Sequence, residues 1–322
     1  MTTESLRPAS PERAPRVRAG RGEARPRPRL LKRDGAWPWL FVLPLIAGVA
    51  VFYLWPVIQT AYFSLTTWGV FGGSSFTGVV NYVRLFADPQ LYSALGNTLL
   101  YTCIVLIGVP LAVWLASLLN TPGLRFAALY RVLFFLPYVA MPTAIAMVWR
   151  IIFNGDFGIL NYLLKFVGIT GPYWISTPGY AMVAVAIVGL WSSLGFSMII
   201  LGAGLKSIPP ELYEASELDG AKPWRQFRSI TVPLLSPSIF FVLIITIIGS
   251  FQLFDLQYAI LGSPTTNPVI PQSLSLVYFF YQQGFVSNDK GYAAAIAMVI
   301  FLIIGIVTLV QFRLQKRWVS VD

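Results

Sequence analysis

Six long apolar runs follow one another along the chain, and short polar segments separate them. A helix needs about 20 mostly apolar residues to cross the hydrocarbon of a bilayer. The runs are continuously apolar and do not alternate, which favours helices over the strands of a membrane barrel. We therefore expect an all-α membrane protein with six transmembrane helices. The spans are predicted at about 39–65, 95–119, 129–153, 180–205, 236–261 and 292–312.

The third predicted span is the weakest of the six, because Pro137 and Pro142 interrupt it. The composition agrees with a membrane location for the whole set. Of the 322 residues, 56% are hydrophobic and only 11% are charged, whereas about a quarter of the residues in soluble domains are charged. The mean hydropathy is +0.69.

Few residues suit catalysis or metal binding. Histidine is absent and Cys103 is the only cysteine, so the usual general base, a disulfide framework and a zinc site are all excluded. We expect no catalytic residue, no metal site and no cofactor on this chain, which is predicted not to be an enzyme.

The basic residues are unevenly distributed. Ten of the 23 Lys and Arg residues lie within residues 1–36. This segment is rich in Arg and Pro and has too few large apolar residues to fold, so we expect a disordered tail. An arm that binds nucleic acid or a partner is one interpretation. A cytoplasmic tail that orients the first helix is favoured, and no nucleic-acid partner is expected.

The remaining basic residues predict the orientation in the membrane. With six spans both termini lie on the same side. That side also receives the basic residues of 125–131, 206–228 and 313–317, and the other side receives only Arg84, Arg150, Lys165 and Lys290. The positive-inside rule places both termini in the cytoplasm, with the protein in a bacterial-type cytoplasmic membrane. No similar halves are visible, which counts against an inverted-repeat secondary transporter.

A charged block lies between the fourth and fifth spans. Pro209 and Pro210 suit the first turn of a helix, and Gly220 suits its end. We predict a short helix at about 209–221, a glycine corner and a second short helix beginning at Pro223. The acids of the first helix are Glu211, Glu214, Glu217 and Asp219, and its apolar stripe is Leu212, Ala215 and Leu218.

Two interpretations of this block differ in what it touches. An amphipathic linker could rest on the lipid headgroups, but the inner leaflet is anionic and would repel four acids within nine residues. The charge pattern therefore favours docking on a protein.

The segment "EASELDGAKPWRQFRSITVP" resembles the EAA motif of permease subunits in binding-protein-dependent ABC importers. The matching positions are Glu214, Ala215, Ser216, Gly220, Ile230, Val232 and Pro233. Ser216 and Val232 replace the usual Ala and Leu. "FTGVVNYVRLF" and "GYAAAIAMVIFLIIGI" resemble the carbohydrate-uptake branch, which includes maltose-type and glycerol-phosphate-type permeases. Gly262-Ser263-Pro264 departs from the usual Gly-Gly-Pro of that branch.

This resemblance implies a type I ABC importer permease fold, in which 209–221 is the coupling helix. Glu214 would contact a cytoplasmic ATPase, Asp219 would be one of the coupling residues and Gly220 would turn the chain back. The implied partners are a second, different permease, two copies of the ATPase and an external solute-binding protein. ATP and Mg²⁺ would bind to the ATPase. This agrees with the lack of a phosphate-binding G-x-x-x-x-G-K-[ST] loop in the sequence.

Candidate solute contacts lie in the fifth and fourth spans. Asp255 is the one acid expected within a span, where burial is costly. On a continuous helix Phe251, Phe254 and Tyr258 form one stripe, and Gln252 lies beside Asp255 on the next. Such a mixture suits a polyhydroxylated ligand, although the carboxylate could also reach the interface and the rings could simply pack. Ser192 and Ser193 could line the path, but close helix packing is favoured for them.

The function that these observations favour is that of a permease subunit in an ATP-driven importer of a sugar or sugar-like solute. The alternative is a stand-alone secondary transporter in which Asp255 couples transport to an ion gradient. A third possibility, a membrane scaffold without transport, fits the Arg-rich tail but leaves Asp255 and the spacing of the EAA motif unexplained.

Overall fold

The computed structural model describes residues 37–68, 73–121, 123–264 and 266–318, so the basic tail at 1–36 lies outside the described residues. The chain divides into two compact units, Met1–Leu54 and Trp55–Asp322. Within the first, the structure describes α1 (Trp37–Val49) and the π-helical turn η1 (Ala50–Leu54). None of the side chains described there is buried, which suits a helix that faces lipid.

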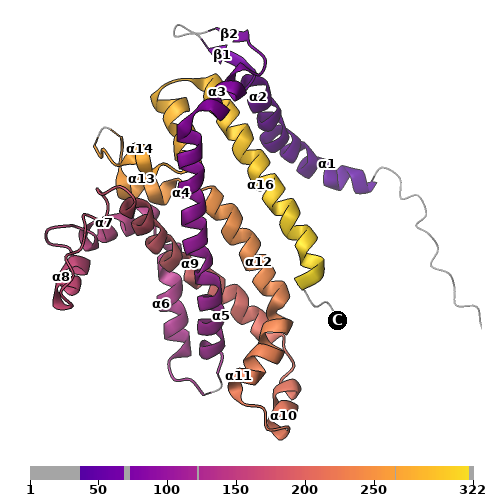
Figure 1. The fold of residues 1–322 in the computed structure, drawn as a ribbon. Coiled ribbons are helices and arrows are strands. Elements are labelled where there is room, and N and C mark those ends of the chain that lie inside the picture. Colours follow the sequence, from indigo (N-terminus) through magenta and orange to yellow (C-terminus); the bar gives the residue numbers. More distant parts are fainter. Residues whose placement is uncertain (1–36, 69–72, 122, 265, 319–322) are drawn as a thin grey trace, which may run out of the picture. The chain divides into compact units, whose positions relative to one another are not determined.

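The second unit is almost entirely helical (Figure 1). Its elements are α2 (Trp55–Phe63), β1 (Thr66–Trp68), β2 (Ser74–Phe76), α3 (Val80–Ala87), α4 (Pro89–Leu106), α5 (Gly108–Leu119), α6 (Ala127–Val139), α7 (Pro142–Ile152), α8 (Ile159–Phe166), α9 (Tyr180–Lys206), α10 (Glu211–Leu218), α11 (Pro223–Gln226), η2 (Phe227–Thr231), α12 (Val232–Phe251), α13 (Asp255–Leu261), α14 (Ile270–Ser273), α15 (Leu276–Tyr281), η3 (Gln282–Val286) and α16 (Lys290–Trp318). The two strands pair antiparallel, with Thr66 opposite Phe76.

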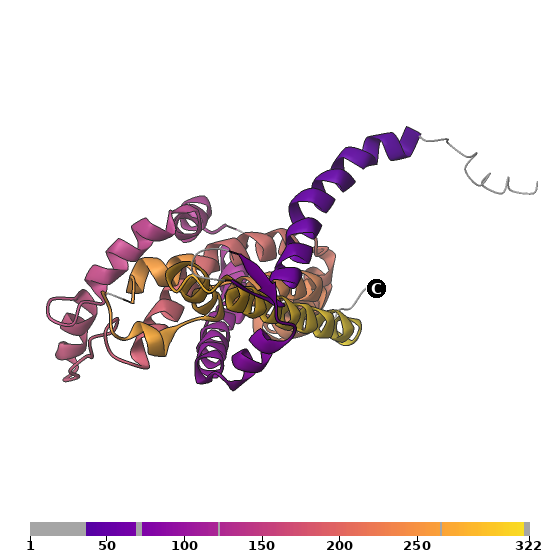
Figure 2. The same ribbon diagram turned by 90° about the horizontal axis from the view of Figure 1, so that it is seen from above.

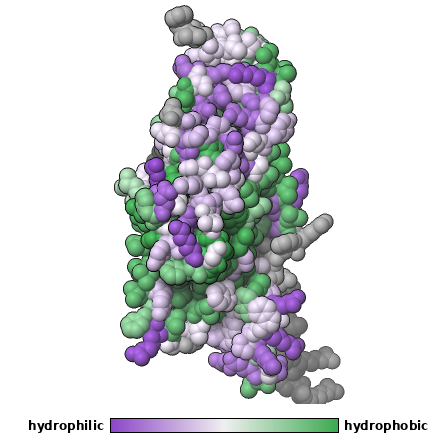
Figure 3. All heavy atoms as spheres, turned by 60° about the vertical axis from the view of Figure 1, so that its left-hand side comes forward, coloured by the Kyte–Doolittle hydropathy of each residue, from purple (hydrophilic) through white to green (hydrophobic). Residues whose placement is uncertain are grey.

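Five helices among the described residues are long and apolar enough to cross a membrane. They are Trp39–Phe63, Pro89–Leu119, Tyr180–Lys206, Pro223–Phe251 and Lys290–Gln315. Four of them match the predicted first, second, fourth and sixth spans closely. On the face drawn in Figure 3, hydrophobic residues (green) gather along the sides and in the middle, with hydrophilic residues (purple) among them.

The third predicted span, 129–153, is not one helix. It is the pair α6 and α7, bent by 99°. The break has a local cause, since Met141 takes an extended backbone conformation before Pro142, and the residue before a proline is disfavoured in the helical region. Pro142 also has no N–H to donate to the carbonyl of Tyr138, four residues earlier.

The fifth predicted span, 236–261, is also wrong at its end. The helix stops at Phe251, and a separate short helix, α13, begins at Asp255. No proline or glycine lies between Phe251 and Asp255. The Ser275 hydroxyl donates a hydrogen bond of 2.7 Å to the Leu253 carbonyl, so a distant residue satisfies a backbone group that the interrupted helix leaves free.

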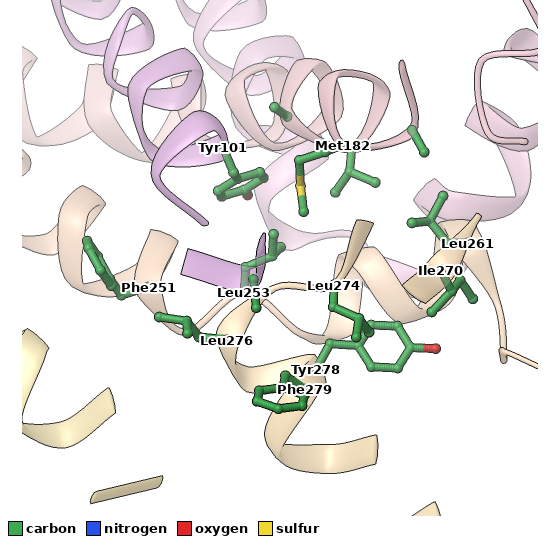
Figure 4. Packing of buried hydrophobic residues seen from close by; sticks show 14 of the residues in the cluster. Tyr101, Met182, Phe251, Leu253, Leu261, Ile270, Leu274, Leu276, Tyr278 and Phe279 are labelled. Atoms are coloured by element: carbon green, nitrogen blue, oxygen red, sulfur yellow. The ribbon is translucent and has the colours of Figure 1, made fainter. Parts of the chain in front are cut away.

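Helix α9 lies at the centre of the second unit and packs against α4, α5, α6 and α12 (Figures 1 and 2). One apolar core joins the first half of α9 to α4, α7 and α13 to α16. Figure 4 shows Tyr101 and Met182 on one side of that core and Leu274 and Tyr278 on the other. A second core joins the last part of α9 to α5 and α12.

Glycines set how closely the neighbours approach α9, since small residues let helix backbones come close. A Cβ atom at Gly195 would overlap the Phe134 carbonyl oxygen of α6, and one at Gly189 would overlap the Tyr101 ring of α4. At Gly202, on the same helix, a Cβ atom would meet open space. The side-chain volume allowed therefore differs sharply between glycines of one helix.

We expect Gly195→Val to destabilise the protein by about 1–3 kcal/mol, because backbone atoms of α6 cannot move aside as a side chain can. Gly202→Ala is the matched control and should leave stability unchanged or slightly raised, since Ala favours helix. Thermal unfolding of both variants in one detergent measures the difference. Equal stability of the two would contradict the close α6–α9 contact.

Candidate coupling segment and solute path

The charged block forms a helix, a corner and a second helix, in the predicted order. Gly220 has a φ of +73°, a conformation that a glycine adopts without strain. The Gly220 amide donates to the Glu217 carbonyl, and the Ala221 amide donates to the Ser216 carbonyl, both at 2.9 Å. This pair of bonds is the Schellman arrangement that ends a helix and reverses the chain.

Side chains hold the two arms of the corner together. The amide of Gln226, on α11, donates to the Ser216 hydroxyl at 2.9 Å, and the Ser216 hydroxyl donates to the Tyr213 carbonyl at 2.8 Å. The hydroxyl groups of Tyr213 and Thr231 are 3.0 Å apart and share a hydrogen bond. We call the hydrogen bond between Gln226 and Ser216 the brace, because it joins α11 to α10. Ser216, which replaces the usual Ala of the motif, is therefore one of its two residues.

Among the residues that the structure describes, none buries the outer surface of α10. Glu214 and Ala215 are exposed, and Asp219 caps the helix in an exposed position. Leu218 is 90% exposed and Trp224 of α11 is 70% exposed, which is costly for large apolar side chains in water unless a partner covers them.

The last two motif positions lead from the corner into the bilayer. Ile230 lies in η2 and packs against the core formed by α5, α9 and α12. Pro233 lies in the first turn of α12. Tyr213 packs against that same core. The corner is therefore attached by its inner side to the ends of two spans, while its acidic side is exposed in the part of the chain that the structure describes.

The predicted solute contacts of the fifth span are separated by the break. Phe251 is buried at the end of α12, and Gln252 caps that helix in an exposed position. Asp255 is exposed at the first position of α13, beyond the span. A carboxylate is favourable at the start of a helix. The expected intramembrane acid is thus an exposed residue outside the span, and the expected stripe through Phe251, Phe254 and Tyr258 does not form on one helix.

The structure places a group of aromatic rings beside Asp255. We call Phe254, Tyr258, Tyr281 and Phe285 the aromatic platform. Phe254 and Tyr258 stack with centroids 5.5 Å apart, Tyr258 and Tyr281 lie edge to face at 5.6 Å, and Tyr281 and Phe285 stack at 5.5 Å. Asp255 shares a helix face with Tyr258, since the two are three residues apart.

Tyr278 lies beneath the platform and fixes it to the chain. It is fully buried, and its ring contacts those of Phe254, Tyr258 and Tyr281. Its hydroxyl donates to the Gly262 carbonyl at 2.5 Å, and burial raises its pKa. Sequence reasoning missed the contribution of α15 and η3; the run "YFFYQQGF" was the one signal that could have indicated it.

Ser192 and Ser193 lie midway along α9, and both are half-buried. The Ser192 hydroxyl donates to the Gly189 carbonyl at 3.1 Å, and the Ser193 hydroxyl donates to the Leu190 carbonyl at 3.0 Å. Each hydroxyl is thus satisfied within its own helix, as packing requires. Nearby, Trp149 and Trp191 pack edge to face at 5.4 Å, and Tyr138 stacks on Phe196 at 4.9 Å.

Residues 91–320 match the model of a family described as the binding-protein-dependent transport system inner membrane component. The chain belongs to this family. Matching relatives include the sn-glycerol-3-phosphate permease UgpA of Yersinia pestis, at 32% identity over 87% of this permease and 94% of the relative. The arabinooligosaccharide permease AraP of Bacillus subtilis is 33% identical over 91% and 96% of the two chains. The lactose permease LacF of Rhizobium radiobacter is 35% identical over 87% and 94%.

Solved structures confirm the predicted fold. The permease superposes with a TM-score of 0.76 and 22% identity on a chain of a bacterial ABC transporter involved in the import of alginate, covering 88% of this permease and 97% of that chain. The fold is that of a type I ABC importer permease. The alternative of an ion-coupled transporter is not supported, since the family is one of binding-protein-dependent systems and Asp255 lies outside the spans.

Removing the brace between Gln226 and Ser216 should loosen the corner formed by α10 and α11. In Gln226→Leu the Ser216 hydroxyl loses its donor, and a hydrogen bond contributes about 0.5–1.5 kcal/mol. We expect amide hydrogen exchange in 211–221 to rise about 2- to 10-fold. Arg225→Gln, an exposed neighbour with no such bond among the described residues, is the control. An unchanged exchange rate in Gln226→Leu would show that the brace does not hold the corner.

Proposed function

We propose that this permease forms the membrane path of an ATP-driven importer for a sugar or sugar-derived solute, with α10 as its coupling helix. One observation carries the proposal. The motif positions Glu214 and Gly220 fall on an acidic, exposed helix and on the left-handed corner that ends it. A surface of this kind, with exposed Leu218 and Trp224, suits docking into a groove of another protein.

The proposed partners follow from the family and from the kind of system its name describes. They are a second, different permease, two copies of a cytoplasmic ABC ATPase and an external solute-binding protein. ATP and Mg²⁺ bind to the ATPase, where the chemistry takes place, and this chain contributes no catalytic group. Both termini and α10 lie on the cytoplasmic side, as the basic residues around them favour.

The corner also provides a route by which ATPase closure moves the spans. α10 follows the end of α9 and precedes η2, which continues into α12. The Tyr213–Thr231 hydrogen bond ties α10 directly to η2. A force on α10 therefore reaches α9 and α12 together, because rigid packed elements transmit displacement rather than absorb it. Their tilt opens the path alternately to the two sides.

The path itself is proposed to pass the break between α6 and α7. A broken helix frees backbone polar groups, and lipid cannot satisfy them. Such a break at membrane depth is tolerated where it lines water or is covered by protein. The aromatic pairs Tyr138–Phe196 and Trp149–Trp191 lie on these helices and α9, and they offer flat apolar faces to the C–H groups of a sugar ring.

The relatives UgpA, AraP and LacF are named for a phosphorylated polyol and for two saccharides. Their common feature is a set of hydroxyl groups on a compact carbon skeleton. The aromatic platform suits this class together with Asp255, which lies on the same short helix as Tyr258, since rings cover C–H faces and a carboxylate pairs with hydroxyls.

Affinity capture of the tagged permease from its own host tests the partners. We expect one second permease and the ABC ATPase in the eluate. Gly220→Val should lower ATPase affinity about 5- to 30-fold, because a β-branched residue destabilises the left-handed conformation by about 1–2 kcal/mol. Glu214→Ala should also reduce ATPase recovery.

Lys165→Gln, which removes an exposed charge on α8 outside the charged block, should leave ATPase recovery unchanged. The proposal fails if the permease elutes alone or as a homo-oligomer. It also fails if the Gly220 and Glu214 variants retain the ATPase as well as the control does.

The platform can be tested in the assembled importer with glycerol 3-phosphate, lactose and an arabino-oligosaccharide as trial solutes. For the solute that is taken up, Tyr281→Leu should raise KM about 2- to 10-fold, since an aromatic face contributes about 0.5–1.5 kcal/mol. Tyr281→Phe, which keeps the ring, should be close to the unmodified protein. Tyr162→Leu removes an exposed aromatic residue of α8, outside the platform, and serves as the control. Uptake unaffected by Tyr281→Leu would exclude the platform from the solute path.

A further inference from the structure

A pocket of about 270 Å³ lies between α5, α6 and α9, at the end of α9 that leads to α10. Its walls are mostly apolar or small and include Ala116, Met198 and Gly202. Two cations, Arg131 and Lys206, complete the lining together with Asn120. The volume lies just below the range of about 300–1,000 Å³ usual for small-molecule sites, so it suits a headgroup-sized ligand.

The positive charge of this pocket has no counterpart in the described chain. No acidic residue lines it, and within the described ranges neither cation takes part in an ion pair. The Arg131 guanidinium donates one hydrogen bond of 2.9 Å to the Leu119 carbonyl at the end of α5, which fixes its position. A guanidinium has five N–H donors, so most of them remain for a ligand.

Capping of helix ends explains part of this arrangement. Arg131 satisfies a terminal carbonyl of α5, and Lys206 is the last residue of α9, where a cation is favourable. Capping explains neither the shared cavity nor the convergence of both cations and an amide on it. Gly202 adds to the cavity, since a Cβ atom there would meet nothing within 4 Å.

We propose that this pocket binds the phosphate of an anionic lipid headgroup, drawn from the leaflet on the side of α10. Guanidinium, ammonium and amide groups together match a phosphodiester, and basic pockets between transmembrane helices bind such headgroups. The apolar walls and the exposed Ile199 at the pocket favour a lipid over a free phosphate ester, because they would cover the start of the acyl chains. The assignment to the cytoplasmic leaflet rests on the proposed function; binding of the lipid does not.

The test uses the full-length permease in discs of phosphatidylcholine, with and without phosphatidylglycerol, and measures the retention of spin-labelled phosphatidylglycerol. We expect preferential retention of phosphatidylglycerol over phosphatidylcholine. Arg131→Gln and Lys206→Gln should each weaken it about fivefold and the double variant about thirtyfold, as one cation near a membrane surface is worth that factor. Arg125→Gln, an exposed basic residue nearby that does not line the pocket, should have no effect.

Gly202→Leu keeps every charge and fills the cavity. It should abolish preferential retention while folding normally, because leucine favours helix over glycine and open space receives its side chain. This variant keeps the test valid if Arg131→Gln fails to fold. Arg131→Lys and Lys206→Arg, which keep the positive charge, should each keep most of the retention of the unmodified permease.

Glycerol 3-phosphate and inorganic phosphate are the soluble probes. Sodium chloride provides the comparison for a purely ionic effect. If the two probes displace the labelled lipid through the same residues at concentrations well below the sodium chloride concentration that displaces it, the pocket is a soluble-phosphate site and the lipid assignment is overturned. Retention unchanged in the double variant or in Gly202→Leu also overturns it. The readout needs no ATPase, so loss of ATPase capture with lipid retention intact would contradict the proposed function alone.

Discussion

The requirement that backbone polar groups be satisfied inside a bilayer governs this structure more than any other constraint. Lipid offers neither donor nor acceptor, so a span must be an unbroken helix unless protein or water covers the break. The permease breaks this pattern within one span, between α6 and α7. α12 ends its own span at Phe251, and there the Ser275 hydroxyl donates to the Leu253 carbonyl, a backbone group that the end of the helix leaves free. The bend between α6 and α7 is the place where a span needs cover from protein or water, and there we propose the solute path.

The apolar pattern was sufficient to predict the fold class and most spans, because length and hydropathy alone decide whether a helix crosses a membrane. The prolines at 137 and 142 indicated a weak point in the third span, but they did not predict the angle of the bend. The end of α12 at Phe251 could not be predicted, since no local residue enforces it and the stabilising hydrogen bond comes from Ser275, more than twenty residues away. The sequence prediction assumed one continuous helix across that break. It therefore placed Asp255 inside the span and put Phe251 and Tyr258 on one helix face.

The corner formed by α10 and α11 was more predictable than the aromatic platform, and the difference has a physical reason. Its geometry is set by local signals, above all the glycine that ends α10 and the proline that begins α11. The aromatic platform depends on tertiary packing of α13 against α15 and η3, which no sequence period reveals. The brace between Ser216 and Gln226 was partly predictable. Both residues can be read from the sequence, but their contact depends on the corner that brings α10 and α11 together.

The central claim is that the exposed side of α10 docks on an ATPase, and site-directed cross-linking tests it most directly. In a Cys103→Ser background, which removes the one native cysteine, Leu218→Cys places a single thiol on the most exposed apolar position of α10. With a heterobifunctional thiol reagent in native membranes, the account predicts a covalent product with the ABC ATPase, in an amount that changes when ATP is added. Products with lipid alone, or no product with any ATPase, would contradict it.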